Sequence, residues 1–125
     1  MGASVDLVLP WPPSVNPLWR NVRIGARQAT LLSEKGRAYF DVAAVEVAKQ
    51  RAGIRFAGVV SVDIVLHAPT RRHYDIDNRI KAALDAMTHG GMWHDDGQVD
   101  VLIVRRGEVR RDGGVAVVRV EEIGQ

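Results

Sequence analysis

The chain has 125 residues, 46% of them hydrophobic, a formal net charge of +2 and no cysteine, so disulfides and thiolate metal sites are excluded. No apolar run approaches the roughly 20 residues of a membrane-spanning helix, and the first residues do not resemble a signal peptide. We therefore expect a single domain over residues 1–125 that lies in the cytoplasm and does not enter a membrane.

The first half of the chain predicts a strand, an irregular stretch and a helix. Alternating apolar residues predict a strand over 4–9, which ends at the proline-rich segment 10–13. Residues 14–32 show no clear period and suit a loop or a ragged hairpin. A helix is expected over 33–51, with Ser33 as its cap. Its apolar residues at helical spacing are Ala38, Val42, Val45 and Ala48.

The second half predicts four further elements. A strand is expected over 59–66, and its residues on one face are Val60, Val62, Ile64 and Leu66. A helix over 77–88 ends at two glycines, and its buried residues are Ile76, Ile80, Ala83, Leu84 and Met87. Strands over 99–106 and 115–121 follow, joined by a glycine-containing turn. The order β-α-β-α-β-β predicts an α+β fold with a mixed sheet and two main helices.

The junction between the middle strand and the second helix carries paired acids. Asp75 and Asp77 lie two residues apart, so an extended backbone points both carboxylates the same way. The helix then places Lys81 one turn further and Asp85 another turn on, along the same face. This polar face is therefore a row of acid, base and acid.

A second acidic pair, Asp95 and Asp96, follows the two glycines. If this turn folds back over the helix start, one of its acids joins Asp75 and Asp77. Three neighbouring carboxylates repel one another and favour a hard cation such as Mg²⁺, which activates water and stabilises charge at a phosphate. Taken singly, the same residues also suit purely structural roles: helix capping for the first pair, a solvated turn for the second and a surface charge for Lys81.

Arginine dominates the basic residues, with 14 of the 17. Its planar fork matches phosphate oxygens, which favours a polyanionic partner, although codon bias in a GC-rich genome accounts for the excess equally well. The pairs expected to contact a phosphate backbone are Arg71 and Arg72, Arg105 and Arg106, and Arg110 and Arg111.

The proline-rich opening and the acidic core together resemble one known family. The matching residues are the run from Leu9 to Asn16, the core Asp75-Ile76-Asp77-Asn78, and then Lys81, Asp85, Trp93 and Asp96. They resemble RusA-type Holliday junction resolvases, the endodeoxyribonuclease RusA family, over about residues 7–122. Two positions depart from the family pattern: His73 and Tyr74 follow Arg72 where further arginines are common, and Arg79 stands where the family is commonly apolar or varied.

This resemblance implies a homodimeric endodeoxyribonuclease that resolves four-way and related branched DNA by paired symmetric nicks, with Mg²⁺ or Mn²⁺ as cofactor. It implies that Asp75, Asp77 and Asp96 are catalytic acids and metal ligands, and that Lys81 is an essential lysine. We also expect Asn78 to contact the DNA. Two further hypotheses stay open: a non-catalytic protein that binds branched DNA, and a metal-dependent phosphatase or nucleotide hydrolase.

Overall fold

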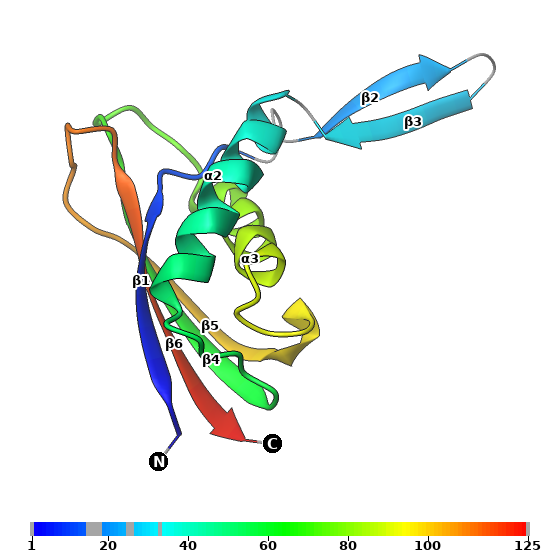
Figure 1. Cartoon of the computed structure of the whole chain (residues 1–125). Helices are drawn as coiled ribbons and strands as arrows, with labels where there is room; N and C mark the ends of the chain where they lie inside the picture. Colours follow the sequence, from blue (N-terminus) through cyan, green and yellow to red (C-terminus); the bar gives the residue numbers. More distant parts are fainter. Residues whose placement is uncertain (1, 15–18, 25–26, 33, 125) are drawn as a thin grey trace.

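A mixed four-stranded sheet with two helices on one face forms the body of the protein (Figure 1). The computed structural model describes residues 2–14, 19–24, 27–32 and 34–124. The strands in their order across the sheet are β1 (Ser4–Pro10), β6 (Val115–Gly124), β4 (Val59–His67) and β5 (Val99–Arg106). The helices are α2 (Glu34–Gln50) and α3 (Ile80–His89). The predicted α+β fold and element order are confirmed.

The irregular stretch of the sequence contains a hairpin. Strands β2 (Trp19–Ile24) and β3 (Arg27–Leu32) pair antiparallel and project away from the sheet and helices (Figure 1). No described helix is long and apolar enough to cross a membrane.

The central strand β4 has neighbours of both directions. It pairs antiparallel with β6 and parallel with β5, and β1 pairs antiparallel with β6. A parallel pair needs a crossover, which here consists of the 3-10 turn η1 (Ile76–Arg79), then α3 and the 3-10 turn η2 (Asp96–Gln98). The four predicted inward residues of β4 are fully buried: Val60, Val62, Ile64 and Leu66.

The two helices differ in which of their regularly spaced apolar residues are buried. In α3 the prediction is confirmed, since Ala83 and Met87 are fully buried and the other expected residues pack against the core. In α2 the helix is present, but the residues whose spacing predicted it are not its buried ones: Val42 and Val45 are each 55% exposed. The buried hydrophobic residues among those described in α2 are Tyr39, Ala43 and Val47. The face with Ala43 is chosen because a small residue allows α3 to approach, and Ala82 and Ala86 of α3 pack there.

One predicted helix boundary shifts. The second helix begins later than expected, because the backbone first makes the 3-10 turn η1 before α3 starts at Ile80. The predicted cap of the first helix, Ser33, lies outside the described residues. The turn between β5 and β6 is confirmed: the Gly114 N–H donates to the Arg110 carbonyl at 3.0 Å, and Gly113 has a φ of 109°.

Candidate active site

Asp75 is placed at the start of η1 by an extended backbone, with φ −84° and ψ 129°. Its side chain makes no capping hydrogen bond, so helix capping does not account for this carboxylate. It is 65% exposed; one oxygen lies 3.6 Å from His73 Nε2, and the other accepts from Asn78 Nδ2 at 3.5 Å. These contacts are long and leave the carboxylate open to a ligand.

Asp77 and Lys81 follow on the outer side of the same segment. Asp77 is exposed in the first turn of η1, and no described residue forms an ion pair or hydrogen bond with its carboxylate. Lys81 is also exposed, and its Nζ lies 3.4 Å from Asp85 Oδ2. The predicted row of acid, base and acid is present, with the lysine turned toward the second acid.

The two acids of the later turn have different roles. Asp95 caps η2: its Oδ1 accepts from the Gly97 N–H at 3.0 Å, and the Gln98 side chain accepts from the Asp95 N–H at 3.0 Å. The Gly97 hydrogen bond, with a contact to Asp96, holds the pKa of Asp95 below its usual range. Asp96 is exposed and is no part of this capping box. A solvated turn therefore describes Asp96 better than Asp95.

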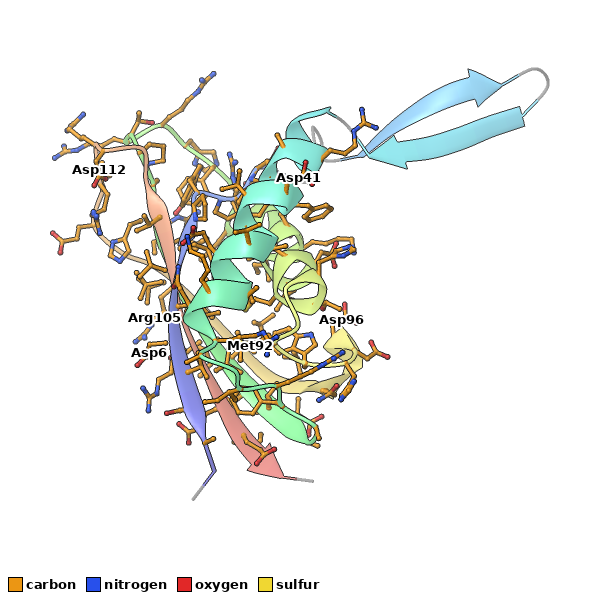
Figure 2. The ribbon with its side chains drawn as sticks, viewed as in Figure 1. Asp6, Asp41, Met92, Asp96, Arg105 and Asp112 are labelled. Carbon is orange, nitrogen blue, oxygen red and sulfur yellow. The ribbon has the colours of Figure 1, made fainter. Side chains whose placement is uncertain are left out.

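The turn that carries Asp96 is anchored at the far end of α3. Trp93 is fully buried, and its Nε1 donates to Thr88 Oγ1 at 2.8 Å. The Gln98 Nε2 donates to the carbonyls of Phe56 and Gly58, at 2.9 Å each. Figure 2 shows Asp96 beside that turn, on the opposite side of the view from Arg105.

One chain does not bring the three predicted acids together. Asp75 and Asp77 precede α3 and Asp96 follows it, and a helix of 10 residues spans about 15 Å. Among the residues that the structure describes, no three Asp, Glu or His side chains lie close enough to hold a metal ion. The turn does not fold back over the helix start, because its tryptophan and glutamine bind it elsewhere.

The predicted arginines divide into two groups. Arg71, Arg72 and Arg106 line one pocket together with His73 and Tyr74. The loop with Arg110 and Arg111 lies beside this pocket, because the Arg110 N–H donates to the Ala68 carbonyl at 2.8 Å; the Arg110 side chain pairs with Asp112 at 3.0 Å. Arg105 lies on the other face of the sheet and pairs with Asp63 at 3.1 Å. Neighbouring strand residues point to opposite faces, which accounts for the division.

Sequence reasoning missed a stacked arginine beside the first acids. Arg79 lies over the rings of Trp11 and Tyr74, with its Cζ 5.3 and 5.8 Å from their centroids, and its Nη1 donates to the Pro12 carbonyl at 2.9 Å. Its Nε is buried with no hydrogen-bond partner among the described residues, and burial lowers its pKa. The sequence contained a signal for this position. Arg79 follows Ile76 by three residues, which places it on the buried side of the predicted helix.

The donor chemistry suits a hard divalent cation. The carboxylates of Asp77 and Asp96 are exposed, and neither forms an ion pair with a described basic side chain. Such oxygens are the ligands that Mg²⁺ prefers. The side chains therefore fit the ion, although a single chain offers them at two separate places.

Comparison with known proteins gives one family. The chain matches the family model described as Endodeoxyribonuclease RusA over residues 10–121. It is 38% identical to the crossover junction endodeoxyribonuclease RusA of Escherichia coli (strain K12), over 97% of each chain. It is 37% identical to the protein of the same name from Enterobacteria phage 82, again over 97% of each chain.

Proposed function

Because this chain belongs to the RusA endodeoxyribonuclease family, we propose that it is a crossover junction endodeoxyribonuclease that hydrolyses phosphodiester bonds in four-way and related branched DNA. One observation carries the proposal. Arg71, Arg72 and Arg106 line one pocket, and the exposed acids Asp75 and Asp77 come directly after the pocket-lining segment in the sequence. Arginines bind the phosphate backbone, and the neighbouring acids supply the hydrolytic site. The enzyme acts in the cytoplasm, where it meets its DNA.

Asp75, Asp77 and Asp96 would hold Mg²⁺, with Mn²⁺ as a substitute. When bound, such an ion lowers the pKa of a coordinated water and offsets negative charge at the phosphate. Asp77 is suited to this because its carboxylate has no competing partner among the described residues. Lys81 is placed to approach the phosphate once its ammonium leaves Asp85, 3.4 Å away. Asn78 stays beside Asp75 and contacts the DNA.

The separation of the acids in one chain leads to a composite site. We propose that the enzyme is a homodimer in which Asp75 and Asp77 of one subunit act with Asp96 of the partner subunit. A two-fold axis then creates two identical sites, which is what paired symmetric nicks in a four-way junction require. Asp95 remains a structural cap in this arrangement.

The first experiment tests hydrolysis. A labelled four-way junction is incubated with Mg²⁺ and either the wild-type protein or Asp77→Asn. We expect paired nicks with the wild type, at least a 100-fold loss with the variant, and retained junction binding by both proteins. No nicking by the wild type, or equal nicking by the variant, would refute the proposal. Cutting in excess EDTA would refute the metal requirement.

The second experiment tests the composite site by subunit mixing. Asp77→Asn and Asp96→Asn chains are each inactive, but their mixed dimer contains one site with all three acids intact, so nicking of one strand returns. A mixture of Asp77→Asn with Asp75→Asn is the control and stays inactive, because both substitutions affect the same half of the site. If the first mixture also stays inactive, the acids act within one chain.

A second candidate function is favoured by the arginine-lined pocket alone. A non-catalytic protein for branched DNA would bind the junction tightly in EDTA, lose affinity steeply with salt and cut nothing. The same junction assay, followed by gel shift as well as strand scission, separates this function from the nuclease.

A further inference from the structure

Tyr74, the residue before Asp75, is held by side chains from three different segments of the protein. The Arg106 guanidinium lies over the Tyr74 ring, with its Cζ 4.9 Å from the ring centroid, and the Cζ of Arg79 lies 5.8 Å from the same centroid. The Trp11 ring meets the Tyr74 ring edge to face at 5.3 Å. Arginine stacks on aromatic rings because its guanidinium is planar and weakly hydrated. Contacts from the end of β5, from η1 and from the proline-rich opening therefore converge on one side chain.

The backbone on each side of Asp75 is held by a hydrogen bond. The Arg106 Nη2 donates to the Tyr74 carbonyl at 2.7 Å, which fixes the peptide group before Asp75. The Asn78 N–H donates to the Asp75 carbonyl at 3.2 Å, which fixes the peptide group after it. Because peptide groups are planar, these two planes together set the φ and ψ of Asp75 and the direction of its Cα–Cβ bond. Arg106 therefore controls one of the two planes that aim this carboxylate.

The end of β5 that carries Arg106 is itself anchored to the centre of the sheet. Arg106 is the partner of Leu66 in the parallel ladder between β5 and β4. The next backbone N–H, that of Gly107, donates to the Leu66 carbonyl at 2.8 Å, and Leu66 is fully buried. Residues 71–75, by contrast, are exposed except for Tyr74, which is partly buried. Arg106 thus connects a rigid strand end to a segment that has little packing of its own.

The other two arginines of the pocket have no such contacts. Arg71 and Arg72 are exposed, and neither side chain forms a hydrogen bond or an ion pair with a residue that the structure describes. A guanidinium without a protein partner keeps all its N–H groups for phosphate oxygens. The pocket therefore contains two kinds of arginine: two that face the solvent freely and one that is engaged with the protein beside Asp75.

We propose that Arg106 is a positioning residue, which holds Tyr74 and thereby aims the Asp75 carboxylate, while Arg71 and Arg72 bind the phosphate backbone. The proposal rests on the proposed function, because it assigns a role within that site. It differs from the expectation from the sequence, in which Arg106 contacts the phosphate backbone. An arginine that acts through Asp75 determines the rate of nicking, whereas an arginine that binds phosphate determines the affinity for the junction.

Arg106→Gln separates rate from affinity. Nicking of a labelled four-way junction is measured at saturating enzyme with Mg²⁺, and junction binding is measured in EDTA at several salt concentrations. The nicking rate should fall about tenfold or more, because a small misplacement of a reacting group is costly. The dissociation constant should change less than about twofold, with the salt dependence of the wild type. Arg119→Gln is the control: Arg119 pairs with Asp6 at 3.1 Å, and its loss should change neither rate nor affinity.

Arg106→Lys separates the shape of the guanidinium from its charge. Lysine keeps the positive charge but lacks the planar group that covers the Tyr74 ring while it donates to the Tyr74 carbonyl. The nicking rate of Arg106→Lys should therefore stay close to that of Arg106→Gln. Wild-type nicking by Arg106→Lys would overturn the proposal. So would an unchanged rate in Arg106→Gln, or a fall of about 1 in the slope of log affinity against log salt.

Amide hydrogen exchange tests the hold on Asp75 without any nicking. Once Arg106→Gln releases the Tyr74 carbonyl, the Asn78 amide that donates to Asp75 should exchange about tenfold faster. Arg71→Gln is the matched control from the same pocket and should leave this exchange unchanged. If the wild type nicks junctions but Asn78 exchange does not respond to Arg106→Gln, the positioning role alone is overturned. If the exchange responds and the wild type does not nick, the hold on Asp75 is supported and the proposed function fails.

Discussion

Arg79 lies 5.3 Å from the centroid of the Trp11 ring, which joins the proline-rich opening of the chain to the segment with the first acids. The two residues are far apart in sequence, and a hydrogen bond from Arg79 Nη1 to the Pro12 carbonyl strengthens the connection. Tyr74 completes the cluster, because its ring meets that of Trp11 edge to face at 5.3 Å. The position of Asp75 therefore depends on packing between two distant parts of the chain.

Arg79→Ala should lower the free energy of unfolding by about 1–3 kcal/mol. The change removes the stacking on Trp11 and Tyr74 together with the Pro12 hydrogen bond. Thermal melting measures the effect, and Arg55→Ala, at an exposed position, is the control, with a change within about 0.5 kcal/mol. Equal melting temperatures for the two variants would mean that the stack contributes nothing to stability.

Neighbouring acids in the η2 turn should respond differently to the same substitution. Asp96→Asn is expected to abolish nicking without lowering the melting temperature, because this exposed side chain takes no part in the capping box. Asp95→Asn should keep most of the nicking, since an asparagine Oδ1 can also accept from the Gly97 N–H. Junction nicking and thermal melting are measured for both. Loss of nicking in Asp95→Asn alone would reverse the assignment of the two residues.

The Asp95 carboxylate should stabilise the fold at pH values above its pKa and not at pH values below it. Folding lowers the pKa of Asp95, chiefly through the Gly97 hydrogen bond. The carboxylate therefore stabilises the fold at a pH where it is ionised in both the folded and the unfolded protein. That contribution begins to fade as the pH falls below the unfolded value of about 4, and it is lost once the pH passes the lower folded value. The wild type should therefore melt above Asp95→Asn at pH 7, and the difference should shrink in acid. A difference that grows in acid would contradict the direction of the shift.

Arg71→Gln and Arg72→Gln should each weaken junction binding and reduce its salt dependence. A lost phosphate contact lowers the slope of log affinity against log salt by about 1. Arg119→Gln is the control, because Arg119 pairs with Asp6 at 3.1 Å on the sheet away from the pocket. Binding is measured in EDTA, so that strand scission cannot interfere. Unchanged slopes for both variants would remove these arginines from the DNA contact.

The strands and the mixed sheet were predictable because their residues alternate strongly. In β4 each inward residue is apolar and buried, whereas the outward residues are partly exposed and include Ser61 and Asp63, so the pattern marks one face for burial. The α2 helix lacked such a contrast, since apolar residues occur on both its faces. The orientation of α2 is set by the small side chains that let α3 approach. This is a tertiary effect, and the hydrophobic periodicity of either helix alone does not reveal it.

The residue types of the candidate site were predictable, but their spatial relation was not. The pair Asp75 and Asp77 stands where the sequence predicted, at the start of a helical segment. Whether a later turn folds back depends on Trp93, which is buried in the core, and on Gln98, whose partners Phe56 and Gly58 are distant in sequence. Arg79 was missed for the same reason, because its role comes from contact with Trp11 rather than from its neighbours.

Gln98 uses both ends of its amide to fix the turn before β5. Its oxygen accepts from the N–H groups of His94 and Asp95, while its nitrogen donates to Phe56 and Gly58. The loop is thus preorganised, and a ligand arriving there has little conformational entropy to remove. Hydrogen exchange of the His94 and Asp95 amides should accordingly be slow and almost insensitive to added divalent ions. Gln98→Ala would make the same two amides exchange freely.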